Sequence, residues 1–211
     1  IKEPIPVVPT CHYMMGGIPT NYYGQVVEPK NGVPNSIVNG LYAIGECACV
    51  SVHGANRLGT NSLLDLVVFG KAAGDHLVKH VKREESFAEL PKDAADRPLA
   101  RLSRLDTTAS GENVTQVGTD MRRTIQTHSG VFRTGKLLDE GVGKIKDIAN
   151  RARSTAIKDR SKVFNTARIE ALELENLALI AEATLVSGAA RKESRGAHFR
   201  QDFPRRNDAE W

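Results

Sequence analysis

One stretch constrains this chain more than any other: residues 53–65, where a loop of small residues runs into an apolar helix. Gly54 and Gly59 let the main chain adopt positive φ angles and approach a ligand closely, which residues with a Cβ rarely tolerate. Arg57 lies between them, and its planar guanidinium can hold a carboxylate through two parallel hydrogen bonds. The stretch therefore predicts a loop at which the backbone and a fixed cation meet an anionic ligand.

The helix after this loop is predicted over about 62–82, with Asn61 or Ser62 as its cap. The first amides of a helix carry partial positive charge, so they favour an electron-rich group placed at the helix start. Gly70 and Gly74 would each cost about 1 kcal/mol relative to alanine, so close neighbours are expected there. The predicted core-facing stripe consists of Leu63, Leu66, Val67, Gly70, Ala73, Gly74, Leu77 and Val81.

Two blocks before this loop carry further polar groups. Residues 41–44 are expected to form a short buried strand, after which Gly45 clears space and Glu46 presents a carboxylate. An acidic side chain at the carboxyl end of a strand suits a ribose or ribityl hydroxyl. In the other block, His12 precedes a Met-Met-Gly-Gly turn. His12 can hydrogen-bond a substrate carboxylate, and the alternative is a core histidine with satisfied hydrogen bonds.

Turn and helix signals organise the rest of the chain. Asn31-Gly32 is a hairpin-type dipeptide between two short apolar runs. Beyond a polar linker, periodic patterns predict helices over about 99–106, 113–128, 136–153 and 165–187, which suggests a small bundle. Asn165 is the expected N-cap of the last helix. The apolar side of that helix is predicted to be Ile169, Leu172, Leu174, Leu177, Leu179, Ile180 and Ala183.

Composition limits the possible classes of protein. With 211 residues, 40% of them hydrophobic, the chain can bury a core. No apolar run approaches the ~20 residues that a bilayer span needs, and no signal-peptide pattern is present, so any membrane contact is expected to go through a partner. Three cysteines argue against a disulfide framework. Cys47 and Cys49 with His53 do not have zinc-site spacing, so no metal site is predicted.

The net charge of +4 is concentrated near the end of the chain. The segment from Arg191 to Arg206 contains six Lys or Arg residues and two acidic residues. In the remaining chain the numbers of basic and acidic residues are equal. A basic stretch that also contains Phe199 and Phe203 can bind nucleic acid, because cations neutralise phosphates and aromatic rings stack on bases. The alternative is a loop that packs back on an acidic surface or on the surface of the domain formed by the first part of the chain. We favour this alternative, and nucleic acid is not an expected partner.

Taken together, the three blocks in this order and spacing resemble the flavoprotein subunit of succinate dehydrogenase. Fumarate reductase flavoproteins belong to the same family. This chain resembles the family closely over residues 4–82 and again over 193–198. L-aspartate oxidase shares the His-Gly-Ala-Asn-Arg-Leu loop, but Cys11 and the run 61–70 are more similar to succinate dehydrogenase. The motifs that carry the resemblance are PTCHYMMGGIPT at 9–20, NGLYAIGECAC at 39–49, HGANRLGTNSLLD at 53–65 and ESRGAH at 193–198.

The resemblance implies an α+β fold, namely the C-terminal piece of an FAD-binding α/β domain followed by a small helical bundle. It implies FAD as the cofactor, contacted by Glu46, Ser62 and Leu63, and a dicarboxylate substrate held by His12 and Arg57. It also implies that the chain is incomplete. The Gly-x-Gly-x-x-Gly cradle, the histidine that attaches FAD covalently and the arginine that transfers the substrate proton are expected upstream, so no catalytic residue is assigned here.

The implied reaction is oxidation of succinate to fumarate, with electrons passing through flavin to an iron–sulfur subunit and quinone. Membrane-anchor subunits are indirect partners, and the location is peripheral, on the cytoplasmic side of a bacterial inner membrane or the matrix side of a mitochondrial one. The alternatives are a fumarate reductase, an L-aspartate oxidase, or a non-catalytic docking module. The expected domains are 1–85 for FAD and substrate binding, 86–98 as linker, 99–190 as helical bundle and 191–211 as a basic extended tail.

Overall fold

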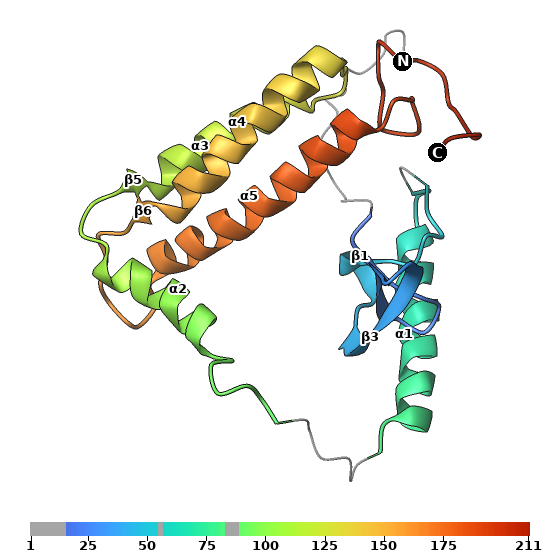
Figure 1. Ribbon diagram of the computed structural model, residues 1–211, viewed down its shortest axis with the longest axis horizontal. Coiled ribbons are helices and arrows are strands. Elements are labelled where there is room, and N and C mark those ends of the chain that lie inside the picture. The colour runs from blue at the N-terminus through green and yellow to red at the C-terminus, as the bar shows by residue number, and fades with distance from the viewer. Residues whose placement is uncertain (1–15, 55–56, 83–88) are drawn as a thin grey trace, which may run out of the picture. The chain divides into compact units, whose positions relative to one another are not determined.

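The computed structural model describes residues 16–54, 57–82 and 89–211 (Figure 1). The chain divides into two compact units, Ile1–Phe87 and Ala88–Trp211. The described strands lie mainly in the first unit, and four of the five described α-helices lie in the second. The fold class is therefore α+β, as predicted.

The first unit contains a hairpin and two short strands beside one long helix. Its hairpin turns at Asn31 and Gly32, where φ is 52° and 80°, and Lys30 faces Val33 in the antiparallel register. Two successive positive φ angles are typical of the type I′ turn that matches strand twist, which confirms the predicted hairpin. The elements are β1 (Ile18–Pro19), β2 (Gln25–Lys30), β3 (Val33–Tyr42), η1 (Gly45–Cys47), β4 (Ala48–Cys49) and α1 (Asn61–His80).

The buried strand expected over 41–44 is wrong in part. Leu41 and Tyr42 end the long strand β3, while Ala43 and Ile44 follow it. Only Ala43 is buried, whereas Leu41 and Ile44 remain 51% and 44% exposed. Ile44 follows the hairpin, and its Cγ2 would lie 2.9 Å from a Cβ added at Gly24, so it is only partly covered by that turn.

Helix α1 forms at the predicted place but buries a different face. Its buried residues are Ser62, Asp65 and Ala73. A Cβ added to Gly24, which has φ of +73°, would lie 3.2 Å from the Cβ of Ala73, so the turn before β2 packs directly on the helix. Small and polar side chains thus make the inner face of α1.

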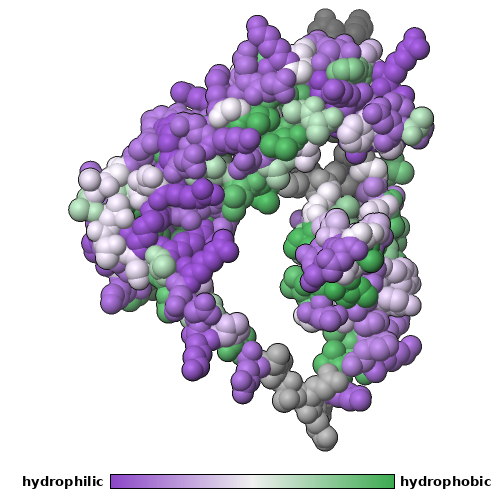
Figure 2. Space-filling view, viewed as in Figure 1, coloured by the Kyte–Doolittle hydropathy of each residue, from purple (hydrophilic) through white to green (hydrophobic). Residues whose placement is uncertain are grey.

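The predicted apolar stripe of α1 is confirmed at Ala73, which is 2% exposed, but is wrong for several of its larger members. Leu63 and Val67 are 64% and 69% exposed. The close neighbours expected at Gly70 and Gly74 are absent among the described residues, since no described atom lies within 4 Å of a Cβ added at either position. In Figure 2, apolar residues crowd the surface of this first unit.

The second unit is a helical bundle with a small parallel bridge. The side chains of Asn113, Thr134 and Asn165 cap α3, α4 and α5, each accepting a hydrogen bond from an amide of the first turn. This confirms the cap predicted at Asn165, and all four helices predicted here form. The elements are α2 (Asp96–Thr107), β5 (Glu112–Asn113), α3 (Val114–His128), α4 (Gly135–Arg153), β6 (Thr155–Ala156) and α5 (Thr166–Ala190).

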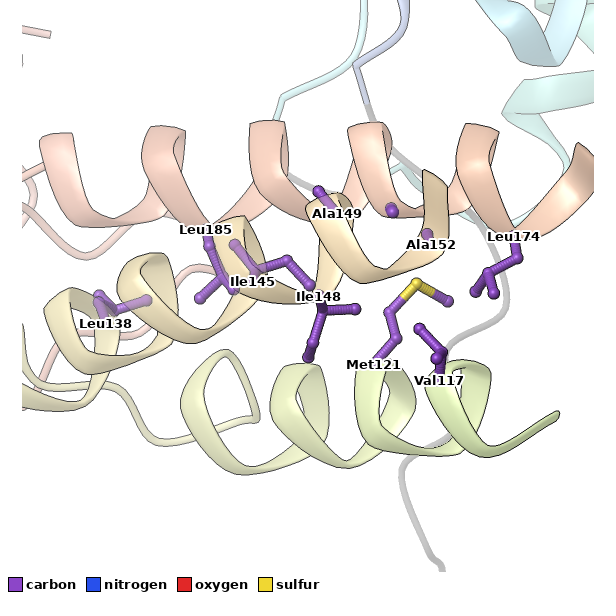
Figure 3. Close-up of a cluster of buried hydrophobic side chains, with 10 residues drawn as sticks. Val117, Met121, Leu138, Ile145, Ile148, Ala149, Ala152, Leu174 and Leu185 are labelled. Atoms are coloured by element: carbon purple, nitrogen blue, oxygen red, sulfur yellow. The ribbon is translucent and has the colours of Figure 1, made fainter. Parts of the chain in front are cut away.

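The core of the bundle lies between α3, α4 and α5 (Figure 3). The predicted apolar side of helix α5 is right only in part. Leu174 is buried as predicted, and so is Leu185, which the prediction left out. Ile169, Leu177 and Leu179 were predicted to be buried but are 54%, 52% and 52% exposed. The sequence of α5 is apolar on several faces, so periodicity alone does not select the inner one. The largest core side chains are Val117, Met121, Leu138, Ile145, Ile148, Leu174 and Leu185.

The segment after α5 folds back on the bundle in place of the extended basic tail that was predicted. Glu193, His198 and Arg200 are 0%, 9% and 2% exposed. The guanidinium of Arg200 donates to carbonyl oxygens at the carboxyl end of α5, including that of Gly188 at 3.2 Å, and pairs with Asp202. Cations are favourable at this end of a helix, so the arginine caps α5 and fastens the segment.

Candidate functional site

The first two sequence blocks meet through a short parallel pairing. β1 pairs with β4, and the amide of Thr20 donates to the carbonyl oxygen of Cys49 at 3.0 Å. Gly17 makes this approach possible: its φ is +122°, and a Cβ there would lie 2.6 Å from the carbonyl oxygen of Cys47. The segment that follows Gly17 is therefore held directly beside η1, which carries Glu46.

The block at 39–49 lies against helix α1, which follows the loop that carries Arg57. η1 packs on α1, and the side chain of Leu66 occupies the space at Gly45, where an added Cβ would lie 2.5 Å from Leu66 Cδ2. Gly45 also has φ of +74°, which favours glycine. Glu46, the next residue, is exposed. The space at Gly45 is therefore taken by a helix side chain, and the prediction that this glycine clears space for a sugar is wrong.

The start of α1 is built without the predicted side-chain cap. Thr60 is the N-cap, with φ of 67°, and its hydroxyl donates to the carbonyl oxygen of Gly59. The expectation that Asn61 or Ser62 would cap the helix is wrong because the helix begins one residue earlier, at Asn61 itself. Ser62 is 9% exposed, whereas Leu63 is 64% exposed and projects from the first turn.

The loop before α1 is held by a polar contact across the helix start. His53 Nε2 donates to Asp65 Oδ2 at 3.0 Å, and their side chains are 14% and 8% exposed. Ser51 and Thr60, on either side of the loop, are non-glycine residues with φ of 63° and 67°. Arg57 lies within this loop and is half-buried. The loop that carries the predicted anion-binding cation is thus fastened to α1.

The predicted site residues fall into two groups. Arg57, Glu46, Ser62 and Leu63 all lie in the first unit, on the loop, η1 and the first turn of α1, which the packing contacts bring into one region. His12 lies outside the described residues. The contact between His53 and Asp65 was missed, because no local pattern in the sequence indicates a contact between residues twelve positions apart.

A hollow of about 530 Å³ elsewhere is not this site. It opens on the surface of the bundle between α3 and α4 and is lined mainly by charged side chains, Lys144 and Arg151 among them. Arg151 donates to Glu112 and Asp120 at 2.7 and 2.8 Å, so its cation is already engaged. Among the residues that the structure describes, no group of three or more His, Cys, Asp or Glu side chains is arranged for a metal ion.

Family models match both ends of the chain. The model described as an FAD binding domain matches residues 1–63, and the model described as fumarate reductase flavoprotein C-term matches 118–211. The chain is 49% identical over 210 residues to the succinate dehydrogenase flavoprotein subunit of Coxiella burnetii, and the match covers 100% of this chain and 36% of that protein. It is 48% identical to the mitochondrial succinate dehydrogenase [ubiquinone] flavoprotein subunit of Oryza sativa, over 100% and 33%.

A solved structure agrees with these relatives. The E. coli quinol fumarate reductase FrdA E245Q variant superposes with a TM-score of 0.81 at 37% identity, covering 100% of this chain and 35% of that one. The chain belongs to the succinate dehydrogenase and fumarate reductase flavoprotein family. It spans about a third of the length of the curated relatives it matches.

FAD is the cofactor of this flavoprotein family, and the residues present fit one edge of it. Glu46 offers an exposed carboxylate after the hairpin. Leu63 projects from the first turn of α1, where an apolar ring can lie against it. No Gly-x-Gly-x-x-Gly fingerprint occurs in the 211 residues, so these residues do not supply the usual pyrophosphate cradle. Within the described ranges, no helix is long and apolar enough to cross a membrane.

Proposed function

We propose that this chain forms the substrate-facing edge of the FAD site in a succinate dehydrogenase flavoprotein subunit. The observation that carries the proposal is the convergence of η1, the Arg57 loop and the start of α1 in the first unit. Among the curated relatives, the chain is 49% identical to the succinate dehydrogenase subunit of Coxiella burnetii and 39% identical to the fumarate reductase subunit of Mycobacterium tuberculosis, which favours succinate as the substrate.

Arg57 is proposed to hold one carboxylate of the dicarboxylate substrate. A guanidinium presents two parallel donors that match a carboxylate, which fixes both position and orientation. The glycines on either side leave room for the substrate to approach the main chain. His12 is proposed to hold the second carboxylate, so that the two carbons to be oxidised lie between two fixed points.

The other three residues are proposed to face the cofactor. FAD, when bound, supplies the acceptor for the hydride that leaves one of those carbons. The Glu46 carboxylate would accept hydrogen bonds from a sugar hydroxyl, while Ser62 and Leu63 would lie against the ring. The amides at the start of α1 add partial positive charge there, which stabilises negative charge that develops during the reaction. The arginine that takes the substrate proton is expected upstream of this chain.

The partners and location follow from the resemblance. We propose an iron–sulfur subunit as the electron acceptor of this flavoprotein and membrane-anchor subunits beyond it, with quinone as the final acceptor. The complex would sit peripherally on the cytoplasmic side of a bacterial inner membrane or the matrix side of a mitochondrial one. Its relatives include proteins from a bacterium and from a mitochondrion.

The proposal is tested by Arg57→Ala in a complete flavoprotein subunit that carries this sequence. Loss of a bidentate clamp should lower the rate of succinate oxidation by at least about a hundredfold, because small displacements of a reacting group are costly. The flavin content, read from the ratio of visible to protein absorbance, should stay unchanged. Arg123→Ala, on the surface of the bundle, is the matched control and should leave both quantities unchanged.

Glu46→Ala should give the opposite pattern. Removing a carboxylate that contacts the sugar should lower the flavin content, while the subunits that retain flavin should oxidise succinate at a near-normal rate. Near-normal succinate oxidation by Arg57→Ala would contradict the clamp. Full flavin content in Glu46→Ala would contradict the assigned cofactor contact.

A further inference from the structure

The contact between His53 and Asp65 joins the loop that carries Arg57 to helix α1. The proposed site requires a fixed position of this loop relative to the helix. His53 belongs to the loop that carries Arg57, and Asp65 lies in the second turn of α1, twelve residues later. The two side chains are 14% and 8% exposed, so most of their surface is out of water. Removing one partner from such a contact leaves a buried polar group unsatisfied, which is costly.

The backbone of the same loop is held in sparsely populated conformations. Ser51 and Thr60 have φ of 63° and 67°, and each is a residue with a Cβ. Such conformations persist only where the surrounding structure determines them, and they occur most often at functional sites. The contact between His53 and Asp65 ties the beginning of this segment to α1.

We propose that His53 and Asp65 form a positioning pair for Arg57, in that they hold the loop so that the guanidinium meets the substrate carboxylate in the productive orientation. The inference rests on the proposed role of Arg57 as the substrate clamp. Binding groups have to be held within about 0.5 Å of the productive geometry, and a long arginine side chain achieves this only on a fixed backbone. His53 acts through the loop, because its Nε2 is occupied by Asp65.

The test is a thermodynamic cycle on malonate binding to the complete, FAD-loaded flavoprotein that carries this sequence. Malonate is a dicarboxylate without two adjacent carbons to oxidise, so calorimetry reports binding alone. The breaking variant is His53→Asn, whose amide is too short to reach Asp65. The matched control is His53→Gln, whose amide nitrogen lies near the position of Nε2. Both are made with Arg57 intact and in the Arg57→Lys background, which removes the planar fork.

With Arg57 intact, His53→Asn should weaken malonate binding by about tenfold to a hundredfold, and His53→Gln by less than about threefold. In the Arg57→Lys background, His53→Asn should weaken binding by less than about threefold, because residues that act as one unit are not additive. Asp65→Ala removes the partner of His53 on helix α1. It should weaken malonate binding to the same extent as His53→Asn in each background. Flavin content and the flavin absorption spectrum should match those of the unaltered protein throughout.

Three results would overturn the pairing. Equal weakening by His53→Asn in both backgrounds would mean that His53 acts independently of Arg57. Unchanged binding would mean that the contact does not position the loop. Loss of flavin in both His53→Asn and Asp65→Ala would mean that the pair holds the fold rather than the clamp. If Arg57→Lys alone binds malonate normally, the substrate clamp itself fails, which is a separate result.

Discussion

At the scale of single residues, buried charge is concentrated at the end of the bundle. The carboxylate of Glu193 is fully buried and accepts from Arg195 Nε at 2.7 Å, from the amide of Asn207 at 2.8 Å and from Arg191 Nη1 at 2.5 Å. These donors, Arg195 first, lower the pKa of Glu193 from its usual 4.5 to about 2, although burial opposes the change. The side chains and backbone of the basic segment after α5 therefore converge on Glu193, an acidic residue of the same segment.

This arrangement predicts how the stability of the 211-residue chain depends on pH. Because the pKa of Glu193 is lower in the folded state, its contacts stabilise the fold fully above pH 4.5 and progressively less as the pH falls toward 2. Thermal unfolding between pH 6 and pH 2 should show a falling melting temperature. Glu193→Gln should lower the melting temperature at pH 6 and flatten its dependence on pH in this window.

The matched control for that measurement is Glu170→Gln, on the exposed side of α5. It should leave both the melting temperature and its pH dependence close to those of the unaltered chain. A Glu193→Gln variant with the full pH dependence of the unaltered chain would contradict the assignment.

At the scale of elements, Gly141 lies at a close contact between three helices of the bundle. A Cβ added at Gly141 of α4 would lie 2.5 Å from the Cβ of His128 and 2.8 Å from Leu185 Cδ2. His128 is buried at this contact, donates from Nδ1 to the carbonyl oxygen of Leu137 at 2.9 Å and accepts from Lys144. α3 and α5 therefore both pack closely on α4 at this position.

Two glycines of the same helix should respond to alanine in opposite directions. Gly141→Ala should lower the free energy of unfolding of the chain by about 1–3 kcal/mol, because the added methyl overpacks the interface. Gly143→Ala should raise it by up to about 1 kcal/mol, because no described atom lies within 4 Å of the added Cβ and alanine favours helix. Urea unfolding followed by helical circular dichroism measures both. A change of the same sign in both variants would contradict this account of the packing.

The sequence predicted where the helices lie far better than which faces they bury. Helix bounds follow from local signals such as the caps at Asn113 and Asn165, and these signals are present in the chain itself. The inner faces of α1 and α5 depend on the neighbouring elements, and both helices are apolar on more than one side. Ser62 and Asp65 are buried on α1 while Leu63 is exposed, which periodicity does not indicate.

In the candidate site, too, local sequence patterns indicated some residues, whereas contacts between distant residues were not predicted. Arg57 and Glu46 were predicted because glycines beside them mark places where the chain approaches a ligand. The contact between His53 and Asp65 was missed because it joins residues twelve positions apart across a loop, and no local pattern records such a contact. The roles of His12, Arg57, Glu46, Ser62 and Leu63 stay predictions, as do the four domain boundaries.

At the scale of the whole molecule, the two units differ in how large a core each one buries. The bundle has a continuous core of its own between α3, α4 and α5. The first unit leaves large apolar side chains outside, among them Leu63, Val67 and Val78 at 64%, 69% and 85% exposed. Contiguous apolar surface of this kind marks a face that packs against further structure or a ligand. The chain spans about a third of the length of its curated relatives, so ample structure exists in this family to cover such a face.

The most direct test of the proposed function is anaerobic reduction of the flavin in a complete flavoprotein that carries this sequence. The protein is mixed with succinate or with L-aspartate, and the absorbance of oxidised flavin is followed with time. We predict that succinate bleaches the flavin, that fumarate restores its absorbance, and that L-aspartate leaves it unchanged. Bleaching by L-aspartate without bleaching by succinate would contradict the assignment of this chain to a succinate-oxidising subunit.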